Sequence, residues 1–515
     1  MSSQEAFLQA ILDDPDDDTL RLIAADWLDE HGDPERAEFI RIQCRLADKT
    51  EADEGWPQLK AREMELLDRH GRAWLGELAG PDCRWGFERG WPATVTCSLA
   101  FFLAKAEDWT RKTPLQKLQL HCDFRRWDMG LPLPDCVALG RLHHLDLSNT
   151  GLEDSSVQAL ADSPHLKNLK SLKLAEHHLT PAGVRALARS TSLAGLTSLD
   201  LSTWKGREWT TPLTDEGMRA LASSPHLTQL TRLVLGGGRF SIDGVKDLLA
   251  SQHLGRLTEL DLGGNDLLGD RDLRVLAGLA GAARLKVLGL EKWGGGQGQS
   301  RSIRAAGVQA LAASKHLAGL IALYLSNNDV GTAGVAALSR SAGLAGLTRL
   351  HLAYNNLGPA EVEILADSPL VRGLRRLDLS GNRLGDDGAR ILAACPALSG
   401  LTHLDLSGNR LGDPGVQALV SSPYLAHLTA LELGGNQFRE SGLLRLAGSP
   451  HMGRLTDLGL ESIELSETTA RGLAESPSLR CVTRLRCRGN QARDYRPRGL
   501  IVQVLQDRWG NHVEL

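Results

Sequence analysis

Two groups of histidine and acidic side chains are the first candidates for chemistry. His143 and His144 stand together, and Glu176, His177 and His178 follow at a similar place in the next repeated segment. Zinc takes about four ligands in a tight geometry. His143 and His144 fall on the outer face of a predicted strand, whereas His177 falls in the loop after one. We therefore interpret them as surface histidines and predict no metal site.

An acidic run and a glycine-rich run also invite a binding function. A calcium loop that starts at Asp14 would need glycine at its sixth position and glutamate at its twelfth, where the chain has Thr19 and Ala25. We interpret the run Asp13–Asp18 as a solvated turn that caps the next helix. The run Trp293–Ser300 lacks the Gly-Lys-Ser/Thr ending of a phosphate loop, so it is interpreted as an insertion.

The sequence signals no enzymatic chemistry. It has no G-x-S-x-G or H-E-x-x-H motif, and no cysteine, histidine and asparagine set with supporting context. We predict that the protein is not an enzyme and that it needs no cofactor.

Composition narrows the class of protein. The chain has 515 residues, 42% of them hydrophobic and 23% charged, which is typical of globular proteins. Residues 1–80 hold 20 acidic and 9 basic side chains, whereas the remainder has a small basic excess, so two units are expected. The basic residues form no concentrated face, which disfavours a nucleic-acid partner.

Location follows from what the sequence lacks. No stretch approaches 18 uninterrupted apolar residues, and Met1–Asp18 has no secretory pattern, so neither a membrane nor a secreted protein is expected. The eight cysteines form no C-x-x-C pair and are interpreted as buried free thiols. We expect a cytoplasmic protein.

A repeat dominates the chain. The pattern L-x-x-L-x-L recurs at a dominant step of 27 residues, with a degenerate copy at Val482. It begins at Leu115, Leu142, Leu169, Leu196, Leu230, Leu257, Leu285, Leu320, Leu347, Leu374, Leu401, Leu428 and Leu455. In each copy the first, fourth and sixth positions are expected to point inward from a short strand, and the intervening positions to line the outer face of a parallel sheet. The segment GVQALVSS that follows one copy has the spacing of a short amphipathic helix. One unit cannot bury its leucines alone, so the units are expected to stack.

Units such as LRRLDLSGNRL from Leu374 resemble leucine-rich repeats, and LTHLDLSGNRLGDPGVQALVSSPYLAH is similar to their helix-bearing, ribonuclease-inhibitor-like class. The resemblance covers Leu115 to Asn490. It implies an α/β fold, a curved solenoid with a parallel sheet on its concave side and helices on its convex side. It also implies that asparagine at the ninth position bonds the neighbouring turns. Asn265, Asn328, Asn355, Asn382, Asn409, Asn436 and Asn490 fit, and Asp123, Thr150, His177, Trp204, Gly238, Trp293 and Ile463 depart.

The flanks complete the expected architecture. RLIAADWLDEHGDPERAEFIRIQ resembles a bacterial repeat-companion domain, over roughly Ser3 to Leu46, and Asp18 is expected to cap its helix. The segment WGFERGWPATVTCSL is predicted to be a first strand or an N-terminal cap. The predicted domains are an acidic helical repeat-companion domain (1–80), an N-terminal cap (81–114), about fourteen repeats (115–491) and a C-terminal cap of helix plus strand (492–515).

The candidate binding residues lie where the repeat departs from its default. The fifth position of the repeat is acidic in six units and the third is basic in five, so the charges of these two columns partly cancel. We interpret the columns mainly as a solvated face. Aromatic residues and one histidine interrupt this pattern, and they are the predicted partner-binding residues: Trp204, Trp209, Trp293, Tyr324, His351 and Tyr354. Such side chains are typical interface hot spots. The alternative is that each tryptophan replaces asparagine and packs its ring into the turn.

The functional hypothesis is a non-catalytic scaffold or adaptor that binds a protein partner on the concave face and the inserted loops. The alternative is a catalytic accessory, such as a GTPase activator with an exposed arginine or asparagine, or a ubiquitin-ligase-like effector with an activated thiol. A purely structural spacer would bury the aromatic residues.

Overall fold

The repeats build one long curved sheet. The computed structural model describes residues 3–15, 17–50, 53, 55–121, 133–177, 179–203, 213–293, 302–489, 498–510 and 513–514. Each strand from β2 to β17 pairs in parallel with the next strand along the chain, and β1 is antiparallel to β2. The strands are β1 (Cys83–Glu88), β2 (Trp91–Ser98), β3 (Lys117–His121), β4 (His144–Asp146), β5 (Ser171–Lys173), β6 (Ser198–Asp200), β7 (Arg232–Val234), β8 (Glu259–Asp261), β9 (Val287–Gly289), β10 (Ala322–Tyr324), β11 (Arg349–His351), β12 (Arg376–Asp378), β13 (His403–Asp405), β14 (Ala430–Glu432), β15 (Asp457–Gly459), β16 (Arg484–Arg486) and β17 (Val513–Glu514).

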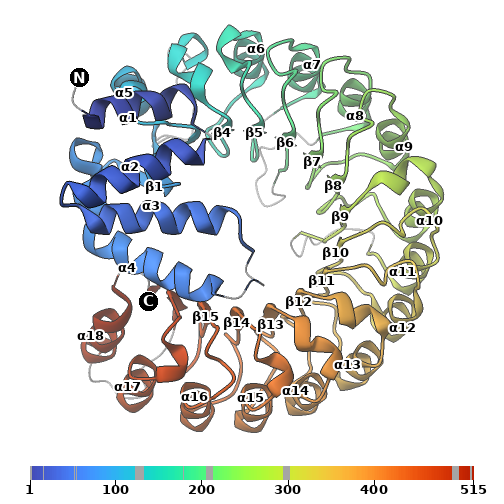
Figure 1. The fold of residues 1–515 in the computed structure, drawn as a ribbon. Coiled ribbons are helices and arrows are strands. Elements are labelled where there is room, and N and C mark those ends of the chain that lie inside the picture. The colour runs from blue at the N-terminus through green and yellow to red at the C-terminus, as the bar shows by residue number, and fades with distance from the viewer. Residues whose placement is uncertain are drawn as a thin grey trace.

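Helices follow the strands and cover the outside of the curve (Figure 1). They are α5 (Leu99–Lys112), α6 (Asp154–Asp162), α7 (Pro181–Arg189), α8 (Asp215–Ala222), α9 (Ile242–Ala250), α10 (Asp270–Gly278), α11 (Ala305–Ala312), α12 (Gly331–Arg340), α13 (Pro359–Ala366), α14 (Gly385–Ala393), α15 (Asp413–Val420), α16 (Glu440–Ala447), α17 (Glu467–Ala474) and α18 (Arg498–Trp509). The predicted curved α/β solenoid is therefore confirmed. Its leucines form one continuous core cluster between strands and helices.

The register of the sheet repeats in every unit. Leu350, Leu377 and Leu404 stand opposite one another on β11, β12 and β13. The fourth-position leucine points into the core, so the third and fifth positions of each three-residue strand face the inside of the curve. The fold thus presents two columns of side chains on its concave face.

Polar ladders join one repeat to the next. On the helical side, serine hydroxyls donate to a carbonyl of the preceding unit, as Ser422 Oγ does to Ala393 O at 2.5 Å. Asp386 Oδ1 accepts from the backbone N–H groups of Gly412 and Gly415, at 2.7 and 3.0 Å, and so caps the next helix. These contacts satisfy helix-end groups that the core cannot satisfy.

Within the described residues, the ninth-position asparagines lie where the repeat pattern implies, and Asn490 lies outside them. Asn382 Nδ2 donates to the carbonyls of Leu352 and Leu379, at 3.0 and 2.8 Å, while its Oδ1 accepts from the N–H of Leu357 at 3.0 Å. His177 takes over this role, because its Nε2 lies 2.8 Å from Leu147 O and its Nδ1 accepts from Leu152 N. The interpretation of His177 as a surface histidine was wrong: only 1% of it is exposed.

Four helices precede the solenoid: α1 (Ser3–Asp13), α2 (Asp18–Glu30), α3 (Pro34–Ala47) and α4 (Trp56–Leu75). The N-cap of α2 is Asp17, whose Oδ1 accepts from Thr19 N at 2.7 Å, and not Asp18 as predicted. The segment predicted to be a first strand or an N-terminal cap forms the β1–β2 hairpin, because Gly90, with φ +89°, allows the chain to reverse there.

The solenoid curves far enough that its first and last repeats approach the same N-terminal helices (Figure 1). Arg454 Nη2, in the segment before β15, donates to the carbonyl of Asp53 at 3.2 Å. The N-terminal helices therefore occupy the gap between the two ends of the repeat array. None of the helices in the described ranges has the length and apolar character needed to cross a bilayer.

Candidate functional site

The centre of the candidate site is a ring pair on the concave face. Tyr324 on β10 and His351 on β11 occupy the fifth position of their repeats and lie opposite each other in the register of the sheet. Their rings meet edge to face, with centroids 4.5 Å apart and planes at 79°. The structure thus brings together two of the predicted binding residues, in a geometry that aromatic pairs favour.

Two carboxylates lie beside this pair. His351 Nδ1 is 3.7 Å from Asp378 Oδ2 and 3.8 Å from Glu291 Oε1. Burial lowers the pKa of His351, and the guanidinium groups of Arg349 and Arg376 act in the same direction against Asp378. Burial also raises the pKa of Tyr324. Near neutral pH the ring pair is therefore uncharged and flanked by acid groups.

Tyr354 lies one turn beyond His351 and is the most exposed of the described candidates. Its backbone is left-handed, with φ +53°, at a position where the next three repeats have glycine. The side chain is 63% exposed, and its ring lies on Gly381 of the next repeat, where a Cβ would collide with it. A large aromatic surface is thus held open to solvent.

Trp293 behaves differently. Its ring covers Gly236 and Gly264 in the turns of the two preceding repeats, where added Cβ atoms would meet the indole carbons. It is half-buried and takes the place of the ninth-position asparagine. This matches the alternative in which tryptophan packs into the turn, so Trp293 supports the structure of the site. Trp204 and Trp209 lie outside the described residues.

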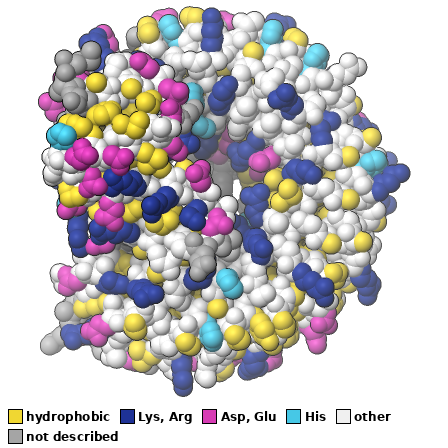
Figure 2. All heavy atoms as spheres, in the orientation of Figure 1, with side chains coloured by type: hydrophobic (Ala, Val, Ile, Leu, Met, Phe, Trp, Pro, Cys, Tyr) yellow, Lys and Arg dark blue, Asp and Glu magenta, His cyan; other side chains and the backbone are white. Residues whose placement is uncertain are grey.

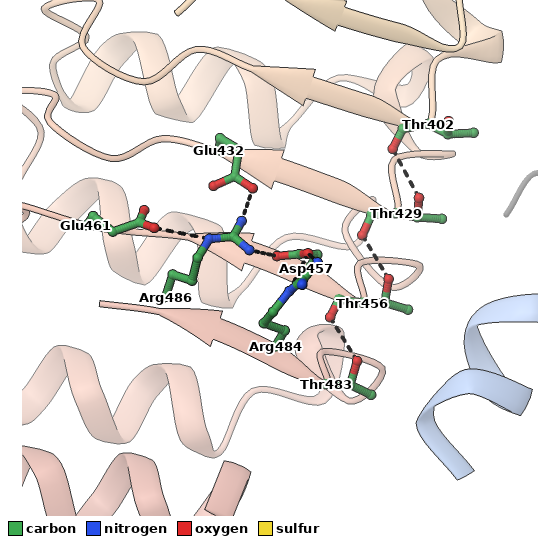
Figure 3. A network of polar contacts seen from close by, with 9 residues as sticks. All are labelled: Thr402, Thr429, Glu432, Thr456, Asp457, Glu461, Thr483, Arg484 and Arg486. Carbon is green, nitrogen blue, oxygen red and sulfur yellow. Dashed lines mark hydrogen bonds and ion pairs between the residues drawn. The ribbon is translucent and has the colours of Figure 1, made fainter. Parts of the chain in front are cut away.

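A second polar centre, drawn in Figure 3, lies on the concave face and was not predicted from the sequence. Arg486 on β16 pairs with Glu432 on β14, with Asp457 at 2.8 Å and with Glu461 at 3.1 Å. Arg484 Nε donates to Asp457 at 2.7 Å. The fifth position of the repeat is acidic in six units, and arginine at this position of the β16 repeat is the signal that could have revealed this centre.

The concave carboxylates are more crowded than a solvated face would be. Burial raises the pKa of Glu432 to about 7 and of Asp405 to about 6, and neighbouring carboxylates add to both effects. Burial likewise raises the pKa values of Asp261 and Glu291. These groups therefore repel one another, and an added cation would stabilise them.

The described residues give no support to the other candidate chemistries. They contain no group of three or more histidine, cysteine, aspartate or glutamate side chains that could hold a metal ion. His144 is exposed, while His178 lies outside these residues. Burial raises the pKa of Cys44 to about 11 and that of Cys97 to about 12, so these thiols are poor nucleophiles.

A known family model matches the repeated segments. The leucine-rich repeat model matches residues 142–161, 165–188, 257–277, 320–339, 374–393, 400–420 and 424–447. The chain contains leucine-rich repeats. Among solved structures, the repeat array is similar to an internalin from Listeria monocytogenes, with 22% identity and a TM-score of 0.38, covering 71% of this chain and 86% of that one. It is also similar to a chain of the Rad7 and Elc1 complex from yeast, with 16% identity and a TM-score of 0.40, covering 68% and 83%. No curated protein matches the repeat chain.

Proposed function

We propose that the protein is a non-catalytic scaffold that binds a protein partner on the concave face of its repeats. The observation that carries the proposal is the ring pair of Tyr324 and His351, with Tyr354 63% exposed in the same repeat as His351. Exposed aromatic side chains on an otherwise polar face are typical of interface anchors. A purely structural spacer would bury Tyr354.

The surrounding charges indicate the chemistry of the partner. Glu291 and Asp378 flank the ring pair, and Asp405 follows on the next strand. The raised pKa values of Glu291 and Asp405 show that their negative charges are poorly compensated. A partner segment that places an apolar side chain on the rings, with lysine or arginine beside it, would fit.

We also propose that the repeats belong to the ribonuclease-inhibitor-like class. Residues 1–80 are proposed to form a repeat-companion domain that caps the array or adds a second contact. Binding by the inserted segments after β6 and β9 stays part of the proposal, although residues 204–212 and 294–301 lie outside the described ranges. The protein is proposed to act in the cytoplasm, without nucleic acid or membrane as partner. The high pKa values of Cys44 and Cys97 weaken the alternative of a thiol-ester-forming ligase.

The test is retention of a partner by matched variants. The full chain, immobilised, is offered an extract of the source cells, and bound proteins are identified by mass spectrometry. Tyr324→Ala/Tyr354→Ala should lose the partner. Tyr424→Ala, in the short helix η8 (Pro423–Leu425) away from the strands, should retain it. If the double variant captures the same proteins as wild type, the proposal is wrong.

A further inference from the structure

A cavity of about 610 Å³ lies in the N-terminal helical region, apart from the concave face. Four half-buried aromatic side chains line it: Phe7 on α1, Trp27 on α2, Trp74 on α4 and Trp91 on β2. Figure 2 shows hydrophobic side chains gathered over this part of the molecule among acidic and basic ones. The size and aromatic lining are typical of cavities that enclose small organic molecules.

A buried arginine lines the same cavity. Arg36 on α3 is 8% exposed, its Nη2 donates to the carbonyl of Gly90, and its Nη1 has no hydrogen-bond partner. Its Cζ lies 4.7 Å from the ring centroid of Trp74 and 5.1 Å from that of Phe87. Aromatic faces therefore compensate this cation where a carboxylate would ordinarily do so.

The nearby acid groups do not neutralise Arg36. Asp33 caps α3, because its Oδ1 accepts a hydrogen bond from the backbone N–H of Arg36, at 3.1 Å, and not from the guanidinium. Glu77 pairs with Lys112 at 2.8 Å. Burial lowers the pKa of Arg36 to about 10, with Asp33 opposing the shift, so the guanidinium is charged at neutral pH but poorly solvated. A buried charge of this kind is stabilised by an anion that meets its free N–H group.

We propose that this cavity binds a small organic acid in which one carboxylate is attached to an aromatic group. The carboxylate accepts from Arg36 Nη1, and the aromatic group packs between Trp27 and Trp74. Nη1 is buried in this conformation, so the carboxylate reaches it when the side chains at the cavity wall shift aside. Glu5, Asp33 and Glu77 also line the cavity, so an anion of higher charge is disfavoured.

The direct test compares an acid with its neutral amide on the full chain. In isothermal titration calorimetry, 3-phenylpropionate should saturate one site, and 3-phenylpropionamide should bind about tenfold or more weakly. In a separate titration, 3-phenylpropionate should change the tryptophan fluorescence. A comparison of the dipeptide Gly-Phe with its C-terminal amide shows whether the cavity also accepts the C-terminal carboxylate of a polypeptide. Equal affinity for acid and amide, or no saturable binding of either acid, would overturn the proposal.

Matched variants assign the effect to the cavity. Arg36→Met should weaken binding of the acid about tenfold or more while leaving the amide unchanged. Arg41→Met, on the same helix but paired with Asp26 and Asp29, should bind like wild type. If circular dichroism shows that Arg36→Met does not fold, Trp27→Ala at the cavity wall decides the question. That variant should weaken binding of acid and amide alike, and wild-type affinity in a folded Arg36→Met or in Trp27→Ala would contradict the proposal.

Discussion

Glu432 and Arg486 form an ion pair although the strand between them, β15, separates their strands by two steps of the sheet. Gly459 makes the pair possible. It holds the fifth position of β15, and a Cβ there would coincide with the carboxylate of Glu432. The absence of one side chain thus lets two others meet across it.

Replacing Gly459 with alanine should break this centre. In Gly459→Ala the new Cβ displaces the carboxylate of Glu432 and leaves Arg486 with fewer partners. We expect the free energy of unfolding to fall by about 1–3 kcal/mol, as measured by urea denaturation. Gly278→Ala is the control, because a Cβ at this helical glycine of α10 meets nothing within 4 Å. A loss of the same size in both variants would contradict this account of Gly459.

Stability should depend on pH through Glu432. Its pKa is about 7 in the folded chain, against an ordinary value near 4, so the folded state binds its proton more tightly than the unfolded state does. The stability that this group contributes is therefore present below about pH 4 and is lost as the pH rises toward about 7. Between pH 5 and pH 8 wild type should lose on the order of 2 kcal/mol more than Glu432→Gln in parallel denaturation curves. Identical pH dependence of the two proteins would show that the pKa of Glu432 is not raised.

His177 should be replaceable by asparagine but not by alanine. Its ring bonds the carbonyl of Leu147 and the N–H of Leu152 inside the turn. His177→Ala leaves both groups buried without a partner, which should cost about 2–3 kcal/mol. His177→Asn introduces the side chain that seven other repeats carry at this position and should recover most of the lost stability in thermal denaturation. Equal melting temperatures for the two variants would argue against a bonding role for the ring.

Cys395 stands in the serine ladder of the convex side. Its Sγ contacts the carbonyl of Ala366 at 3.5 Å, where serines such as Ser422 donate a shorter bond to Ala393. A hydroxyl is the stronger donor, so Cys395→Ser should raise the free energy of unfolding by about 0.5–1 kcal/mol. Cys97→Ser, a fully buried cysteine on β2, is the contrasting control and should lower it. A destabilised Cys395→Ser protein would remove this residue from the ladder.

The repeat fold was predictable because the same leucine spacing recurs in each unit. Leu350, Leu377 and Leu404 stand in one row because the leucine spacing alone dictates which face is buried. The chemistry of single positions was harder to predict. His177 looked like a surface residue because spacing cannot show that imidazole bonds the same backbone groups as asparagine.

The candidate site was predicted in part, for a similar reason. Tyr324 and His351 were found because they share one strand position in adjacent repeats. The structural role of Trp293 depends on glycines in two earlier turns, and the Arg486 centre depends on the side chain that Gly459 lacks. In both cases a side chain of one repeat fills the space that a glycine leaves open in another repeat. Such a relationship leaves no local pattern in the sequence.

The central claim is that the ring pair and Tyr354 anchor a protein partner on the concave face. Its most direct test is the affinity of the captured and purified partner for wild type, Tyr324→Ala, Tyr354→Ala and Tyr424→Ala, measured by isothermal titration at pH 7.5. Loss of a buried aromatic anchor should weaken binding by about 2 kcal/mol, roughly thirtyfold, in each of the first two variants. Tyr424→Ala should match wild type. Equal affinity of all four proteins would contradict the claim.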